Sequence, residues 1–227
     1  MIDESSPTRS QPRTAFAALA ATAVRDVATL REIYGPSSHA VQHKQVDRIH
    51  EVSRRLIGCS SFVLIGTADA DGSCDVSPRG GPPGFVAVLD ERTLAIPDAT
   101  GNRRIDSLRN IVATGRAGLL FLVPGRNDTL RVNGRAVVCA DPGLLAQLTA
   151  VGRPPRTAIV VEVEEVYGHC PKSLLRGAVW KPEQWPARDA APSSAEVTLS
   201  HLSASLDGLT VEMIEQAEEE SLRLRYE

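Results

Sequence analysis

Apolar and polar residues alternate in the stretch Leu130-Arg-Val-Asn-Gly-Arg-Ala-Val-Val138. Successive side chains of a β-strand point to opposite faces of a sheet, so this alternation predicts a strand with one buried and one polar face. The segment from Thr157 to Tyr167 alternates in the same way and predicts a second such strand. We therefore expect the fold to be built around a β-sheet.

Shorter segments before these two predict further strands, and they cover Phe62 to Ala68, Cys74 to Ser77, Phe85 to Leu89, Thr93 to Pro97 and Gly118 to Val123. Six or seven short strands with few intervening helices cannot form a doubly wound parallel sheet, which needs a crossover helix at nearly every step. The sequence therefore predicts an α+β fold dominated by β-structure, a small antiparallel barrel with helices packed outside it.

Helices are expected at both ends of the chain. Apolar residues recur at helical spacing from Thr14 to Ile33, and a second helix, capped by Ser37 or Ser38, is expected to reach about Leu56. An acidic helix is expected from about Thr210 to Leu224, after a linker rich in Ala, Pro and Ser. The expected organisation is a disordered segment at 1–13, helices packed on the barrel at 14–58, the barrel at 59–180, and a linker with a C-terminal helix at 181–227.

Length and composition exclude several classes of protein. The chain has 227 residues, of which 42% are hydrophobic, so it can bury a sizeable core. Its net charge is −3 and it has no basic stripe, which argues against a nucleic-acid partner. No stretch reaches the length of a membrane span. The four cysteines form no CxxC pair, which favours free thiols in a reducing cytoplasm, with Cys59 and Cys139 in the core.

Two arginines follow a candidate helix cap in Gly101-Asn-Arg-Arg104. We expect a helix from Asn102 that turns Ile105, Leu108 and Val112 inward. If Asn102 is its cap, Arg103 and Arg104 stand in its first turn. There the helix dipole is positive and amide hydrogens lack partners. Two cations are therefore unfavourable at this position unless an anion lies between them. Helix N-termini bind phosphate, and arginine adds bidentate hydrogen bonds to it. The alternative is that both side chains extend into solvent.

Two other segments carry candidate chemistry. The loop Ser77-Pro-Arg-Gly-Gly-Pro-Pro-Gly84 has unusual backbone freedom and a single cation, so it is either a close approach to a planar ligand or an ordinary connection. His39, His43 and His50 share one face of a helix, but a zinc site needs ligands that surround the ion, and the HExxH pattern is absent. The sequence therefore predicts no metal site.

The segment His169-Cys-Pro-Lys172 places an acid/base group, a thiol and a cation at the end of the last strand. Adjacent residues of a strand point to opposite faces, so His169 and Cys170 are not expected to act as a nucleophile–base pair. His169 and Lys172 are the candidates for catalysis, since a histidine moves protons at neutral pH and a lysine attracts an anionic substrate. The alternative is that this segment only packs the C-terminal tail onto the barrel.

Taken together, several short motifs resemble the FMN-binding split barrel of the pyridoxamine 5′-phosphate oxidase-like superfamily. They are Asp75-Val-Ser-Pro-Arg-Gly80, Leu94-Ala-Ile-Pro-Asp98, Gly101-Asn-Arg-Arg-Ile-Asp-Ser-Leu-Arg-Asn110, Leu119-Leu-Phe-Leu-Val-Pro124 and Thr129-Leu-Arg-Val-Asn-Gly-Arg135. A bacterial subgroup of FMN-dependent flavoproteins also resembles the chain at Tyr34-Gly-Pro36 and at His169-Cys-Pro-Lys172. The likeness extends from about Thr29 to Trp180.

This resemblance implies a six-stranded antiparallel split β-barrel that binds FMN at the interface of a homodimer. The basic pair of the family falls on Arg103 and Arg104, next to Asn102, and would hold the FMN phosphate. The residues that would line the ribityl chain and the ring are Ser77, Pro78 and Arg79 on one strand and Ile96, Pro97 and Asp98 on another. Thr129 and Arg131 would reach the flavin from the second subunit.

The resemblance also implies a function, that of an FMN-dependent oxidoreductase acting on a small substrate. Vitamin B6 oxidation is not expected, because the C-terminal substrate motif of the oxidases is missing and Thr129 stands where a glutamine is typical. His169 and Lys172 would lie on the substrate side of the flavin. The alternatives are a flavin-binding or redox-sensing protein without turnover, and a barrel that binds deazaflavin or haem, the latter through His169 or His201.

Overall fold

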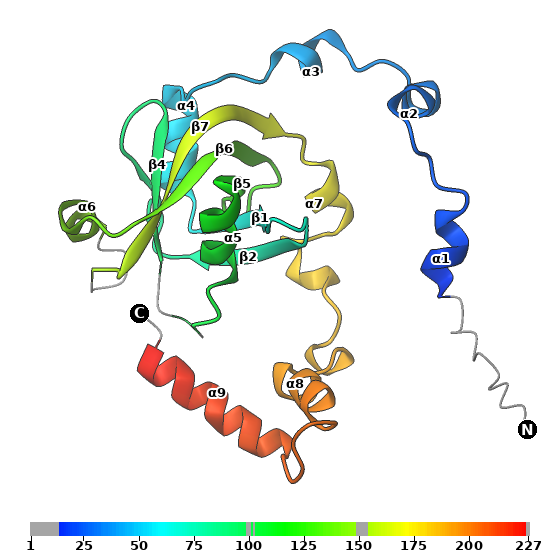
Figure 1. Ribbon diagram of the computed structural model, residues 1–227, viewed down its shortest axis with the longest axis vertical. Coiled ribbons are helices and arrows are strands. Elements are labelled where there is room, and N and C mark those ends of the chain that lie inside the picture. The colour runs from blue at the N-terminus through cyan, green and yellow to red at the C-terminus, as the bar shows by residue number, and fades with distance from the viewer. Residues whose placement is uncertain (1–13, 99–100, 102, 149–153, 226–227) are drawn as a thin grey trace, which may run out of the picture. The chain divides into compact units, whose positions relative to one another are not determined.

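The computed structural model describes residues 14–98, 101, 103–148 and 154–225. The chain divides into two units, Met1–His43 and Lys44–Glu227. The described part of the first unit contains three short helices, and the second unit contains the β-sheet, the helices that pack on it and the C-terminal helices (Figure 1).

The first unit contains α1 (Ala15–Ala20), α2 (Val27–Tyr34) and α3 (His39–His43), none of which has a buried residue. The prediction of one continuous helix from Thr14 to Ile33 is therefore wrong. The break occurs at Asp26, whose carboxylate accepts a hydrogen bond from the Thr29 amide at 2.8 Å and caps α2. A short acidic side chain that bonds to the backbone in this way favours a new helix start over continuation of the old one.

The second predicted helix, from Ser38 to Leu56, is also interrupted, between α3 and α4 (Glu51–Cys59). In the intervening segment Val46 exchanges two backbone hydrogen bonds with Val166, at 3.0 and 2.7 Å. The Ile49 amide also donates to the Glu91 carbonyl at 2.7 Å. These contacts with distant parts of the chain override the local helical periodicity.

One antiparallel sheet of seven strands dominates the second unit, in the order β2-β1-β5-β6-β7-β4-β3 (Figure 1). The strands are β1 (Phe62–Ala68), β2 (Cys74–Gly80), β3 (Ala87–Val88), β4 (Thr93–Asp98), β5 (Arg116–Leu122), β6 (Thr129–Cys139) and β7 (Thr157–His169). The predicted β-dominated antiparallel fold is confirmed. The strand count is seven rather than six, and among the described residues no hydrogen-bonded ladder joins β2 to β3, so the sheet is not closed.

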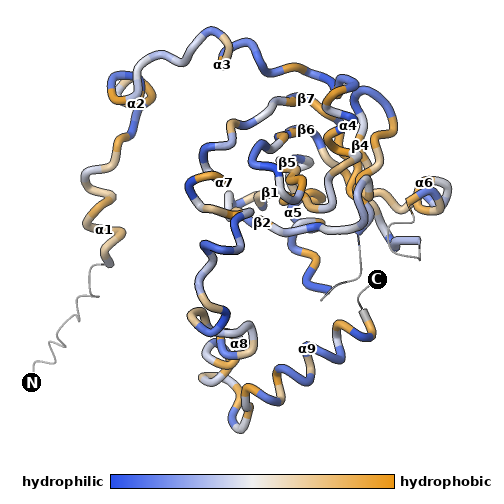
Figure 2. Tube along the Cα trace, turned by 180° about the vertical axis from the view of Figure 1, so that it is seen from behind, coloured by the Kyte–Doolittle hydropathy of each residue, from blue (hydrophilic) through white to orange (hydrophobic). Residues whose placement is uncertain are grey.

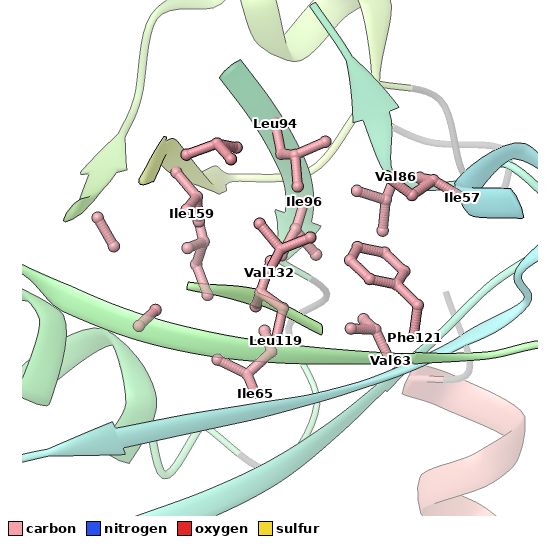
Figure 3. Close-up of a cluster of buried hydrophobic side chains, with 14 of the residues drawn as sticks. Ile57, Val63, Ile65, Val86, Leu94, Ile96, Leu119, Phe121, Val132 and Ile159 are labelled. Atoms are coloured by element: carbon pink, nitrogen blue, oxygen red, sulfur yellow. The ribbon is translucent and has the colours of Figure 1, made fainter. Parts of the chain in front are cut away.

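The core lies on one face of this sheet. Strands β1 and β5 bury every second residue there, as in β1, where Val63 and Ile65 have no exposed surface, whereas β4 buries four residues in succession. Figure 3 shows side chains from five strands, α4 and the β2–β3 loop meeting in this cluster, with Ile57, Val63, Ile65, Val86, Leu94, Ile96, Leu119, Phe121, Val132 and Ile159 labelled. Figure 2 shows hydrophobic segments along the strands of the sheet. Apolar residues at every second position therefore set the strand faces.

Helix α5 (Asp106–Thr114) is tied to the edge of the sheet by buried polar groups. Ser107 donates to the Asp75 carboxylate at 3.1 Å, and the Asn110 amide donates to the Thr67 hydroxyl at 3.0 Å. The expectation that Ile105, Leu108 and Val112 face inward is wrong for Ile105 and Val112, which are exposed, and is confirmed for Leu108, which packs against the core. The helix turns Ser107, Asn110 and Ile111 toward the sheet instead, because hydrogen bonds as well as apolar contacts orient it.

The remaining helical segments are α6 (Pro142–Gln147), α7 (Lys172–Arg176), two short 3₁₀ helices (Pro182–Gln184 and Arg188–Ala190), α8 (Ser194–Leu202) and α9 (Val211–Arg225). The C-terminal helix was predicted, and Figure 2 shows hydrophilic and hydrophobic residues mixed along it. Helix α8 begins within the predicted linker, where Ser193 and Glu196 form a capping box. No helix among the described residues has the length and apolar character needed to span a bilayer.

All four cysteines are free, as the sequence predicts. The expectation that Cys59 and Cys139 belong to the core is wrong, because Cys59 is exposed and Cys139 is only partly buried. In α4 it is Ile57, not the terminal cysteine, that reaches the core.

Candidate functional site

A cleft of about 390 Å³ lies between β2, the end of β4 and the start of α5. Its volume falls in the range of pockets that bind small molecules, about 300–1,000 Å³. It is lined by Asp75, Ser77, Pro78, Arg79, Gly80, Pro97, Asp98, Gly101, Arg103, Arg104, Ile105, Asp106, Ser107 and Leu108. Seven of the eleven predicted cofactor residues are in this set, from three segments that are distant in the sequence.

Strand β2 supplies polar groups to the cleft because it is the last strand at its end of the sheet. Asp75, Ser77 and Arg79 pair in register with Thr67, Ile65 and Val63 of β1, which are buried. The three β2 side chains thus lie on the core-facing side of the sheet, but at its edge. The edge position keeps them within reach of a ligand, while their β1 partners face the core.

Arg79 of β2 and Asp98 of β4 form an ion pair in the cleft, although their strands belong to opposite parts of the sheet order. The Arg79 Nη2 and Nε atoms lie 3.1 and 3.2 Å from the same oxygen, Asp98 Oδ1. The Arg79 Nη1 atom donates to the Ser77 hydroxyl at 2.8 Å and to the Pro78 carbonyl at 2.9 Å. The guanidinium therefore joins the two strands across the cleft.

The surroundings of this pair oppose ionisation of Asp98. Its side chain retains only 14% exposure, and burial raises the pKa of the Asp98 carboxyl above its ordinary value. Arg79 lowers the pKa of the same carboxyl, through its charge and its hydrogen bonds. The arginine is therefore the counter-ion that allows a carboxylate at this depth.

The segment before α5 has an unusual backbone. Arg103 and Ile105 have φ angles of 61° and 55°, in the left-handed region that residues other than glycine seldom adopt, least of all a β-branched one. The helix begins at Asp106, so the prediction that Arg103 and Arg104 stand in its first turn is wrong. They precede it on a kinked segment. Asn102, the predicted cap, lies outside the described residues.

Charges in the cleft are formally balanced, with three arginines and three aspartates among the residues that line it. Asp98 pairs with Arg79, and Asp106 contacts both Arg104 and Arg109. Within the described part of the chain no carboxylate pairs with Arg103, which is exposed. Arg103 is therefore the cleft cation best placed to meet an added anion.

Three other predicted residues gather on a different surface. In the β6–β7 register Thr129 pairs with His169, and Arg131 pairs with Tyr167. The β5, β1 and β2 registers align Arg131 with Leu120, Leu64 and Pro78, whereas Ser77 and Arg79 belong to the opposite face of the sheet. Thr129, Arg131 and His169 therefore do not line the cleft of their own chain.

The structure separates the remaining predicted residues from both groups. Ile96 precedes the cleft residues Pro97 and Asp98 on β4, but its own side chain is fully buried in the core. Lys172 is exposed at the start of α7. No close contact between His169 and Lys172 is found in the described structure, so the two catalytic candidates do not form one cluster.

Sequence reasoning missed several residues that line the cleft. Asp75 could have been found from its spacing, because it precedes Ser77 and Arg79 at the two-residue period of a strand. Asp106 and Ser107 had no comparable signal, since the predicted helix began four residues too early and assigned them to its interior.

The sequence was compared with the patterns of known protein families and with curated proteins. The pattern of the family described as pyridoxamine 5′-phosphate oxidase matches residues 49–170, more than half of the chain. No curated protein matches the sequence.

Similar solved structures include HupZ of Group A Streptococcus, with 18% identity, 53% of this chain and 93% of that chain covered and a TM-score of 0.45. An F420 reductase shares 17% identity, with 51% and 94% covered and a TM-score of 0.38. A pyridoxamine 5′-phosphate oxidase-related, FMN binding protein of Nostoc punctiforme shares 11% identity, with 51% and 76% covered and a TM-score of 0.37. On the match to residues 49–170, which contain the whole sheet and every residue given above as lining the cleft, this chain belongs to the pyridoxamine 5′-phosphate oxidase family.

Proposed function

We propose that this protein binds FMN in the cleft between β2, β4 and α5 and uses it to oxidise or reduce a small molecule. The observation that carries the proposal is the cleft itself, which in a chain of this family brings Arg79, Arg103 and Arg104 to one cavity. Its volume suits a ligand of this size class. Residues predicted for the phosphate and residues predicted for the flavin ring line this same cavity.

The phosphate end of FMN is assigned to the segment before α5. Arg103 supplies a guanidinium without a carboxylate partner in the described structure, and Arg104 is held beside the helix start by Asp106. The first-turn residues Ser107 and Leu108 line the same end of the cleft, where the helix dipole favours an anion. The residues therefore fit a dianionic group, although Asp106 competes with it for Arg104.

The ring end is assigned to β2 and the end of β4. Pro78 and Pro97 offer rigid apolar surfaces, and Arg79 offers hydrogen-bond donors fixed by Asp98. When bound, FMN supplies the ability to accept and return a hydride. The task of these residues is to orient the ring, limit its contact with water and set the charge beside it.

We also assign a homodimer to the protein. Arg131 and Thr129, the residues expected to contact flavin, lie on the sheet face away from Ser77 and Arg79 of their own chain. They can reach a flavin only in a partner's cleft, which requires a two-fold assembly. Sedimentation of the flavin-loaded protein should give about twice the 24.3 kDa of one chain. A loaded species sedimenting at the mass of one chain contradicts this assembly.

The direct test of FMN binding is the visible spectrum of the purified protein, followed by identification of the chromophore released on unfolding. Replacing Arg103 and Arg104 with Ala together should weaken FMN binding by about 100-fold or more. The reason is that each charge-assisted hydrogen bond contributes about 1.5–3 kcal/mol. Arg109→Ala is the matched control, because Arg109 is an exposed arginine on α5 that does not line the cleft.

The outcomes separate the competing functions. A double variant that retains FMN as tightly as the wild type would refute the assignment of the arginines. Bleaching of bound flavin by NADH or NADPH supports an oxidoreductase, whereas bound flavin that no donor reduces supports a flavin-binding protein without turnover. A released deazaflavin or haem would replace FMN in the proposal.

A further inference from the structure

A second cavity, of about 390 Å³, lies between α4 and the connection from β5 to β6. Its volume is again within the range of small-molecule pockets, about 300–1,000 Å³. Among the described residues that line it, none also lines the cleft proposed for FMN. The cavity is therefore a separate candidate site, to which the proposed function gives no role.

Helix α4 supplies one wall of this cavity. The residues of the helix that line it are Val52, Arg55, Leu56 and Cys59. At 100° per residue these four positions fall within an arc of about 100° around the helix axis. Ile57 lies on another side of the helix and points into the core, as Figure 3 shows. The core contact of Ile57 therefore fixes the rotation of α4 that presents the four residues to the cavity.

The connection between β5 and β6 supplies the other wall, with Val123, Arg126 and Asp128 as its lining residues. Hydrogen bonds hold this wall in place. The Ser60 hydroxyl, just after α4, donates to the Leu122 carbonyl at 2.7 Å. The Trp180 indole N–H donates to the Arg126 carbonyl at 2.6 Å. Both walls are thus fixed by the fold, and a preformed site loses little free energy to ordering when a ligand binds.

The charges of the lining residues favour a ligand with one negative charge. Two arginines and one aspartate line the cavity. Arg126 Nη2 lies 3.2 and 3.0 Å from the two carboxylate oxygens of Asp128. This hydrogen bonding lowers the pKa of the Asp128 carboxyl, which is therefore ionised at neutral pH. The Arg55 side chain is exposed and has no ion pair or hydrogen bond with any residue that the structure describes, so it is the cation available to a ligand.

The apolar part of the lining is aliphatic. Val52, Leu56 and Val123 contribute branched side chains, and no aromatic ring is among the described residues that line the cavity. The Val52 side chain is also 75% exposed, so the fold itself does not cover it. Covering such a surface with an aliphatic chain is favourable, roughly in proportion to the apolar area removed from water.

We propose that this cavity binds an aliphatic monocarboxylate, such as a medium-chain fatty acid, with its carboxylate on Arg55 and its chain against Val52, Leu56 and Val123. Arginine binds a carboxylate through two parallel hydrogen bonds. Asp128 disfavours a dianion, because like charges repel each other. The bound chain covers the Cys59 thiol, which is free and exposed in the protein alone.

The test is a calorimetric titration of the purified protein with octanoate, below the concentration at which octanoate forms micelles. One octanoate should bind per chain. Acetate lacks the chain, octanol lacks the charge, and inorganic phosphate lacks the chain and carries a second charge. Each of these three probes should bind about tenfold or more weakly than octanoate, because each loses at least one of the two kinds of contact.

Alkylation of the cysteines by iodoacetamide, followed by mass spectrometry, shows where octanoate binds. Octanoate should slow the alkylation of Cys59 and leave that of Cys74 and Cys170 unchanged. Both of these thiols are exposed and neither lines the cavity. They therefore control for a general effect of the fatty acid on the protein.

One variant and a matched control test the role of Arg55. Arg55→Met keeps an unbranched aliphatic side chain but removes the charge, so octanoate should bind about tenfold or more weakly. Because Arg55 is exposed, this variant should fold. Arg48→Met is the control, since Arg48 precedes the same helix, pairs with Asp47 and Glu91, and does not line the cavity.

Four results would overturn the proposal. The first is a titration with no saturable binding of octanoate, and the second is octanol binding as tight as that of octanoate. The third is equal weakening by Arg55→Met and Arg48→Met. The fourth is alkylation of Cys59 that octanoate does not slow more than that of Cys74 and Cys170. None of these readouts uses flavin, so the test succeeds or fails whether or not the protein binds FMN.

Discussion

Replacing Arg79 with Ala removes the counter-ion of Asp98 and leaves a carboxylate in the cleft. The two side chains are only 19% and 14% exposed, and two guanidinium nitrogens lie within 3.2 Å of the carboxylate. Breaking a fully buried ion pair costs about 3–5 kcal/mol, and a hydrogen bond to a charged group contributes about 1.5–3 kcal/mol. Because some exposure remains and both nitrogens contact a single oxygen, we expect a loss of about 2–3 kcal/mol at pH 7.

The loss should depend on pH. Burial already raises the pKa of Asp98, and removing Arg79 removes the opposing influence, so the folded-state pKa rises further. An unfolded aspartate has a pKa of about 3.9. Between that value and the raised one the folded state binds more protons, so stability falls as the pH rises through this window. The variant should therefore be closest to the wild type near pH 4 and furthest from it at pH 7.

Urea unfolding followed by circular dichroism measures the effect at both pH values. Asp98→Asn removes the charge but keeps the side-chain shape, so the double variant should be more stable than Arg79→Ala alone at pH 7. Arg126→Ala is the control, since its pair with Asp128 is mostly exposed and surface pairs contribute little. Equal losses at pH 4 and pH 7, with no recovery in the double variant, would refute the counter-ion role.

Two further predictions concern the sheet. Gly134→Ala should prevent stable folding, measured by thermal unfolding, because a Cβ there would lie 1.9 Å from a backbone oxygen of β7; Gly66→Ala, with 3.7 Å to its nearest atom, should be tolerated. The lowered pKa of His169 contributes stability that is present above about pH 6.5 and lost as the pH falls toward the folded pKa. His169→Asn should therefore flatten the dependence of the melting temperature on pH, and an unchanged slope would contradict this reasoning.

The strands of the sheet were predictable because the alternation of apolar and polar residues that marks them lies within each short segment of sequence. In β6 the alternation of Leu130, Val132 and Ala136 with polar residues marks the buried face, apart from the irregularity between Asn133 and Gly134. Helix bounds were less predictable, because apolar periodicity continues across residues that interrupt the helix. Asp26 starts a new helix by capping, and Val46 leaves helical geometry to bond to a distant strand.

Many of the residues that line the site were predictable, but the ion pairs and contacts between them were not. The resemblance to the family placed Arg79, Asp98, Arg103 and Arg104 among the ligand contacts, and all four line the cleft. That Asp98 neutralises Arg79 depends on how the sheet curves to bring β2 near β4, which no local pattern encodes. The contact of Lys44 with the Tyr167 ring was missed for the same reason, since the two residues are 123 positions apart in the sequence and are brought together by the Val46–Val166 bridge beside β7.

The balanced charge of the cleft bears on its selectivity. A cleft with several unpaired cations would attract any polyanion, whereas here Asp98 and Asp106 occupy two of the three arginines. Anion binding then rests on where Arg103 is held, and its left-handed backbone, like that of Ile105, costs about 1–2 kcal/mol. The hydrogen bond from Ser107 to Asp75 anchors the helix that follows and so helps to keep this conformation. In the proposed FMN complex, phosphate binding would therefore depend on the intact contact between α5 and β2 that holds this strained segment, rather than on arginine content alone.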